Sequence, residues 1–155
     1  MSIITDFLEG TGKDHRNRGI EDILNFDDED LEAAHDYIQW LFPLAESSAF
    51  NRFAPVLSSQ DIAMLKHSEV ARRNTIEAAA RMLAFYKRQS HWLTAINHNH
   101  LRISRIIRSL ALVLGPQEGQ KFHSELMKLV QEAGNPVAEE ALDYWRRAVQ
   151  HQSSK

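Results

Sequence analysis

The chain has 155 residues, 43% of them hydrophobic and 25% charged, a balance typical of one globular domain. It contains no cysteine, which excludes disulfides, thiolate metal sites and a cysteine nucleophile. Only 6 glycines and 4 prolines are present, and apolar residues recur at helical spacing. We therefore predict an all-α fold, a single compact bundle of about six to seven helices.

In the first half, helical spacing predicts a helix over Ser2–Glu9 and a short helical or extended piece over Ile20–Phe26. Asp30–Leu44 is predicted as the central buried helix, ended by Pro43 because proline cannot continue the hydrogen-bond ladder. Gly10–Gly19 is predicted as a loop or mobile arm. Residues 44–56 are predicted as a packed irregular connector, with apolar anchors at Phe50, Phe53 and Val56.

In the second half, the order of Ser58 and Asp61 is typical of a capping box and predicts a helix that begins near Ser59. Asn99 is predicted to cap another helix. Apolar stripes place the remaining helices over Ser68 to about Lys87, Leu101–Leu114, Gln117–Ala133 and a last segment that ends near Gln150. Residues 151–155 are predicted to fray.

The N-terminus lacks the basic and apolar regions of a signal peptide. Apolar runs such as Leu110–Leu114 are far too short to cross a bilayer. We therefore predict a cytoplasmic protein without membrane insertion.

Charge is distributed unevenly along the chain. Residues 6–36 hold eleven acidic and three basic side chains, whereas residues 66–108 hold nine basic and two acidic ones. The two regions could face each other or be solvated, or the basic region could bind an anionic partner. Arg102, Arg105 and Arg108 fall opposite the apolar stripe of their helix, so they could hold phosphates or nucleic acid, or pair with the acidic third.

The string Asn97-His98-Asn99-His100 is the best candidate for chemistry. Two imidazoles in a His-x-His pattern could bind a metal ion, with His91, His35 or an acid as a third ligand. The alternative is that Asn99 caps a helix while the imidazoles bond to nearby carbonyl groups. A Gly-rich phosphate loop, a nucleophile elbow and an HExxH motif are all missing from the sequence, so we predict no enzymatic activity and no cofactor.

Five aromatic residues surround the end of the predicted central helix: Tyr37, Trp40, Phe42, Phe50 and Phe53. They could line a groove for a peptide. Core packing is the stronger interpretation, because aromatic residues at helical spacing are mostly buried.

Two strings give the chain a family resemblance. Residues 35–44, HDYIQWLFPL, and residues 98–110, HNHLRISRIIRSL, resemble two blocks of the opioid growth factor receptor family. Ile20–Leu24, Met82–Tyr86 and Ala141–Tyr144 are similar to other family segments in the same order. The resemblance divides the chain into an arm at 1–19, the conserved domain at 20–150 and a tail at 151–155.

For animal members the resemblance implies a non-classical receptor that binds an enkephalin peptide and restrains cell proliferation. The long C-terminal extension of those members is missing and residues 1–19 do not match, so we expect a short, stand-alone, microbial member. The family supplies no catalytic or ligand-contacting residue that can be transferred to a position of this chain.

We predict a non-enzymatic binding or receptor-like module whose partner is a peptide, a protein or a small anion. The site is predicted where the segment 35–44 meets the segment that begins at Asn97, since aromatic, amide, imidazole and guanidinium groups would converge there. The candidate residues are Tyr37, Gln39, Trp40, Asn97, His98, Asn99, His100, Arg102, Arg105 and Arg108. The alternatives are anion or nucleic-acid binding through the arginine face, and an enzyme or metal site around His98 and His100.

Overall fold

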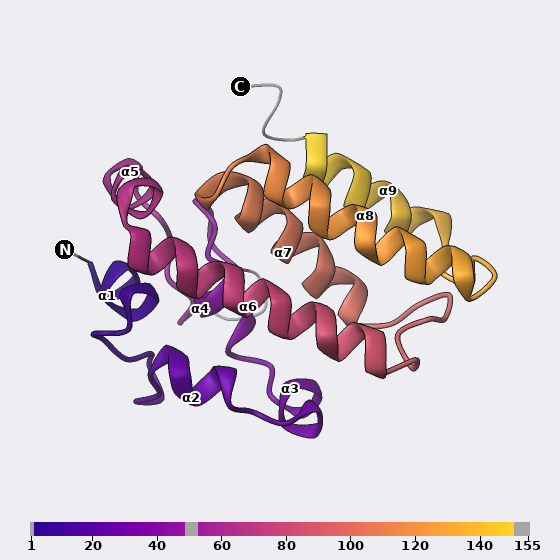
Figure 1. The fold of residues 1–155 in the computed structure, drawn as a ribbon, viewed down its shortest axis with the longest axis horizontal. Coiled ribbons are helices and arrows are strands. Elements are labelled where there is room, and N and C mark those ends of the chain that lie inside the picture. Colours follow the sequence, from indigo (N-terminus) through magenta and orange to yellow (C-terminus); the bar gives the residue numbers. More distant parts are fainter. Residues whose placement is uncertain (1, 49–52, 151–155) are drawn as a thin grey trace. The chain divides into compact units, whose positions relative to one another are not determined.

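The computed structural model describes residues 2–48 and 53–150, which form helices, turns and loops (Figure 1). The helices are α1 (Ile3–Glu9), α2 (Ile20–Leu24), α3 (Asp28–Ala33), α4 (Ile38–Leu41), α5 (Ser59–His67), α6 (Glu69–Arg88), α7 (Asn99–Val113), α8 (Pro116–Glu132) and α9 (Glu139–Gln150). These described residues contain no strand, only an isolated parallel bridge between Leu44 and Val56. The all-α prediction is confirmed, with nine helices in the described part rather than six or seven.

The chain divides into two compact units, Met1–Ala78 (unit 1) and Ala79–Lys155 (unit 2), and α6 runs from one into the other. The prediction of a single bundle is corrected accordingly, because each unit has its own buried side chains. Two predictions lie outside the described residues: the anchor at Phe50 and the frayed tail at 151–155.

The predicted central helix Asp30–Leu44 is wrong, since the structure divides it into α3 and α4. Ala34 leaves helical geometry, with φ −80° and ψ 136°. The buried hydroxyl of Tyr37 then donates to the carbonyl oxygen of Leu31 at 2.6 Å. This bond satisfies a carbonyl group that a helix end leaves open. The helix therefore ends well before Pro43.

Side chains cap the short helices of unit 1. Ser2 accepts from the backbone N–H of Thr5 at the start of α1, and Asp27 accepts from Asp30 at the start of α3. At α5, Ser58 and Asp61 exchange side-chain bonds with each other's backbone N–H groups at 3.0 and 2.9 Å, which confirms the predicted capping box. Each cap satisfies a donor that has no partner inside its helix.

The segment Gly10–Gly19 is a loop, as predicted, and a buried carboxylate holds its centre. Asp14 Oδ1 accepts from the backbone N–H groups of Arg16 and Arg18, both at 2.9 Å. Between them, Asn17 adopts a left-handed conformation with φ 62°. These bonds to Asp14 define the path of the loop between Asp14 and Arg18.

In unit 2 the long helices α7, α8 and α9 pack against one another (Figure 1). Gly119 of α8 permits a close approach to α7, because a Cβ atom there would lie 3.0 Å from the carbonyl oxygen of Ile107. The fully buried Trp145 of α9 donates its indole N–H to the carbonyl oxygen of His100 at 2.9 Å. No helix in residues 2–48 and 53–150 is long and apolar enough to span a bilayer.

Candidate functional site

The ten predicted site residues belong to different units. Tyr37, Gln39 and Trp40 lie in unit 1. The other seven predicted site residues fall between Asn97 and Arg108 and lie in unit 2. The structure describes each unit by itself, so the convergence of the two sets stays a prediction. Each set nevertheless has a defined local geometry.

In unit 1 the predicted residues are buried: Tyr37 is fully buried, Gln39 is 9% exposed and Trp40 is 5% exposed. Tyr37 closes the turn between α3 and α4, which is a structural role. The indole Nε1 of Trp40 is buried and has no hydrogen-bond partner among the described residues. Such a donor is rare in a folded protein, because leaving it unpaired costs free energy.

The ring of Trp40 is the inner member of an aromatic stack, which we define as Trp40, His15 and Phe53. His15 lies nearly parallel to Trp40, with ring centroids 6.0 Å apart and 17° between the planes. The rings of His15 and Phe53 are also nearly parallel, with centroids 5.7 Å apart and 13° between the planes. Phe53 is 60% exposed, so the stack joins buried residues to the surface.

A carboxylate and two guanidinium groups flank the stack. Asp36 accepts from Arg16 Nη1 at 3.0 Å and from Arg18 Nη2 at 3.1 Å, and its Oδ2 lies 3.7 Å from His15 Nε2. Partial burial acts to raise the pKa of Asp36, but the bonds and charges of Arg16 and Arg18 together outweigh it and hold that pKa below its ordinary value. Asp36 therefore stays ionised and organises the basic side chains.

Sequence analysis missed His15, Arg16, Arg18 and Asp36. Nothing in the local pattern of residues 10–19 indicates that an imidazole is placed on Trp40, which is 25 positions away. The available signal was only compositional, namely three basic residues and His15 within an otherwise acidic third of the chain.

In unit 2 the amide of Asn99 is the centre of a polar cluster, which we call the Asn99 cluster. Its Nδ2 lies 3.0 Å from Asn97 Oδ1 and 3.5 Å from both His91 Nε2 and His98 Nε2. Its Oδ1 accepts from the buried hydroxyl of Tyr86 at 3.1 Å. Asn99 lies inside α7, whose N-cap is His98, so the predicted cap at Asn99 is wrong.

His100 points into the interior instead of joining this cluster. Its Nε2 lies 2.8 Å from the carbonyl oxygen of Trp92, and since a carbonyl only accepts, Nε2 carries the proton. Burial lowers the pKa of His100, although the bond to Trp92 acts in the opposite direction. In the part of the chain that the structure describes, no three metal-binding side chains gather into one group.

The predicted arginine face is only partly on the surface. Arg102 is 9% exposed, whereas Arg105 and Arg108 are half-buried and Leu101 is 54% exposed. None of the three predicted arginines is therefore fully exposed, and α8 and α9 pack against this helix.

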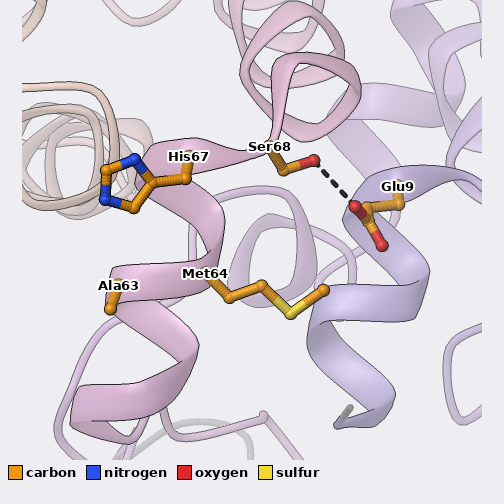
Figure 2. A pocket seen from close by; sticks show the side chains of 5 residues that line it. All are labelled: Glu9, Ala63, Met64, His67 and Ser68. Atoms are coloured by element: carbon orange, nitrogen blue, oxygen red, sulfur yellow. Dashed lines mark hydrogen bonds between the residues drawn. The ribbon is translucent and has the colours of Figure 1, made fainter.

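A shallow hollow lies between α1 and α5 (Figure 2). Ser68 donates to Glu9 Oε2 at 2.7 Å and accepts from the backbone N–H of Ala71 at 3.1 Å. Figure 2 shows the imidazole of His67 pointing away from this pair. The bond from the Ala71 N–H to Ser68 is that of a helix cap at the start of α6.

The described residues thus define an all-α protein with two polar and aromatic side-chain clusters. A sequence profile of the "Opioid growth factor receptor (OGFr) conserved region" matches residues 15–92, which is half of the chain. The chain therefore belongs to the opioid growth factor receptor family. No solved structure matches it.

Its relatives include the opioid growth factor receptors of Rattus norvegicus and Mus musculus, which are 36% and 37% identical over 84% of this chain. The opioid growth factor receptor-like protein 1 of Mus musculus is 34% identical over 81% of the chain. The matches span 26%, 24% and 32% of these relatives, so the chain covers only a third of their length or less. All three are vertebrate proteins, and they give no support to the expected short, stand-alone, microbial member.

Proposed function

We propose that this chain is a non-enzymatic, receptor-like binding module and that its ligand is a peptide. The observation that carries the proposal is the Asn99 cluster, in which a buried amide fixes polar side chains near the protein surface. Large aliphatic residues precede and follow the cluster in the chain, Ile96 with 87% exposure and Leu101 with 54%. Relatives that are named receptors support a receptor-like role.

A peptide presents both of the features that these residues can bind. Its backbone offers N–H and C=O groups. The side-chain NH2 of Asn97 can donate, whereas its Oδ1 already accepts twice from Asn99, and the imidazole of His98 can donate and accept. An apolar side chain of the peptide would pack on Ile96 and Leu101. Because Asn99 already holds its neighbours, little conformational entropy remains to be lost on binding.

The test measures binding of an opioid peptide, and of a random peptide library, to the full chain by calorimetry. His98→Ala and Leu101→Ala are each expected to weaken binding by about fivefold to tenfold, the effect of one hydrogen bond or one packed side chain. His67→Ala is the matched control, because His67 is also an exposed imidazole but lies in α5.

Two results would contradict this proposal in different ways. Peptide binding that is unchanged in His98→Ala and Leu101→Ala places the site elsewhere. A library from which no peptide binds removes the peptide as the ligand class.

A further inference from the structure

The hollow between α1 and α5 combines apolar walls with a carboxylate at its edge (Figure 2). Ala63 and Met64 of α5 supply apolar atoms, and Figure 2 shows the Met64 side chain extending from α5 toward α1. The hollow measures about 460 Å³ and opens widely to solvent. An aliphatic side chain of a partner can therefore enter it and pack on Met64, whose flexible thioether adapts to irregular shapes.

The carboxylate of Glu9 is held in place at this edge. Its Oε2 accepts from the hydroxyl of Ser68 at 2.7 Å, a length typical of a bond to a charged acceptor. Ser68 is itself fixed, because its oxygen accepts from the backbone N–H of Ala71. Within residues 2–48 and 53–150, Glu9 forms no ion pair with a basic side chain. A half-buried negative charge beside apolar atoms thus has no cation of its own in this part of the chain.

The elements around the hollow are rich in acidic residues. Helix α1 carries Asp6 and Glu9 and no basic residue, and α6 begins with Glu69. Lys66 of α5 supplies an opposing positive charge. Residues 6–36 hold eleven acidic side chains against three basic ones. The field of such a surface attracts cations and repels anions.

We propose that this hollow binds a lysine side chain of a partner protein. The aliphatic stem packs on Met64 and the ammonium group pairs with Glu9, because lysine keeps its stem on apolar surface and its charge near water. Lysine is favoured over arginine, since Ser68 already occupies Oε2 and a guanidinium group pairs best with both carboxylate oxygens. The site lies in unit 1 and does not depend on the peptide proposed for the Asn99 cluster.

The test measures which short random peptides the immobilised full chain retains at low salt, with mass spectrometry as the readout. Three pools with neutral ends and no acidic residue carry a fixed lysine, arginine or ε-acetyllysine at the centre. The lysine pool is expected to bind about fivefold better than the acetyllysine pool, the upper end for an ion pair near a protein surface. Higher salt should remove this preference, because it screens exposed charges.

Two variants separate the charge from the apolar wall. Glu9→Gln keeps an acceptor for Ser68 and should abolish the preference for lysine over acetyllysine. Met64→Ala should weaken the binding of both pools by about fourfold, the equivalent of one buried methylene group. Glu132→Gln and Met127→Ala are the matched controls, because they change the same residue types in α8, and they should leave the binding of both pools unchanged.

Four results would overturn the proposal. Equal binding of the lysine and acetyllysine pools removes the role of charge, and a preference for arginine assigns the hollow to a different cation. A lysine preference that survives Glu9→Gln places the site elsewhere. Self-association of the chain that Glu9→Gln abolishes, measured by sedimentation, makes a second copy the occupant in place of a partner protein.

Discussion

Units 1 and 2 hold their helices in different ways. In unit 1 the helices α1 to α5 have only four to nine residues, and side chains cap α1, α3 and α5. In unit 2 the helices α7, α8 and α9 have 15, 17 and 12 residues. The Asn97 side chain accepts from the first N–H of α7, and the N-cap residue of α8 makes no side-chain bond. The helices of unit 1 are too short to be stable alone. Unit 1 therefore depends more on specific polar contacts, and unit 2 more on apolar packing between long helices.

The two candidate sites follow the same division. In unit 1 the stack joins Trp40 of the short helix α4 to loop residues, and Asp14 and Asp36 hold the loop that carries His15. The Asn99 cluster is instead anchored in the first turn of a long helix. In both sites a polar group with little exposure fixes more exposed ones. The comparison predicts that polar substitutions will affect unit 1 most and apolar truncations will affect unit 2 most.

The largest expected effect is in the core of unit 2. Trp145→Ala removes a fully buried ring that contacts Trp92 and His100, and it should lower the free energy of unfolding by about 3–5 kcal/mol. Chemical denaturation measures this. Tyr144→Ala is the control, because Tyr144 is 47% exposed and should cost far less. A loss below about 1.5 kcal/mol for Trp145→Ala would show that packing does not dominate unit 2.

A smaller effect is expected at the turn between α3 and α4. Tyr37→Phe removes the buried hydroxyl that donates to Leu31, and it should cost about 1–2 kcal/mol, since the carbonyl oxygen loses a buried donor. The free energy of unfolding measures the cost, with Tyr144→Phe as the exposed control. Equal stability of Tyr37→Phe and the unmodified chain would contradict the role of this bond in ending α3.

The same turn shows why part of the fold could not be read from the sequence. Apolar spacing predicted one helix over Asp30–Leu44, but the break depends on where the Tyr37 hydroxyl bonds and on Asp36, which meets arginines 18 and 20 positions away. Periodicity reports only neighbours within a few turns. In unit 2 the long apolar stripes are enough to locate the helices. The predicted helix Gln117–Ala133, for example, differs from α8 by one residue at each end.

The candidate sites follow this pattern as well. The unusual string from Asn97 to His100 drew attention to the Asn99 cluster, although only the structure shows that Asn99 is its centre and that His100 turns inward. The stack at His15 had no comparable local signal, because its members are separated by at least 13 positions along the chain. Sequence patterns find sites made from one segment more readily than sites assembled from several.

Capping in unit 1 gives a third, smaller prediction. Ser58→Ala removes the side-chain acceptor for the Asp61 N–H at the start of α5 and should cost about 1 kcal/mol. Thermal or chemical unfolding measures it. Ser124→Ala is the matched control, since Ser124 is exposed within α8 and alanine has the higher helix propensity. A cost at Ser124 equal to that at Ser58 would remove the distinction between the units.

The smallest effect is a difference in acid sensitivity. Burial lowers the pKa of His100 below 6.5, so the unfolded chain binds a proton at a higher pH than the folded chain does. The stability that unit 2 gains from neutral His100 is present above about pH 6.5 and is lost as the pH falls below it. Asp36 in unit 1 has a pKa below 3.8, so its contribution is lost only as the pH falls below that value.

His100→Gln should therefore flatten the profile of stability against pH between about pH 7 and pH 5. Asp36→Asn should flatten it only at lower pH, and denaturation midpoints measure both effects. A profile that His100→Gln leaves as steep as that of the control His67→Gln would assign the acid sensitivity to other groups.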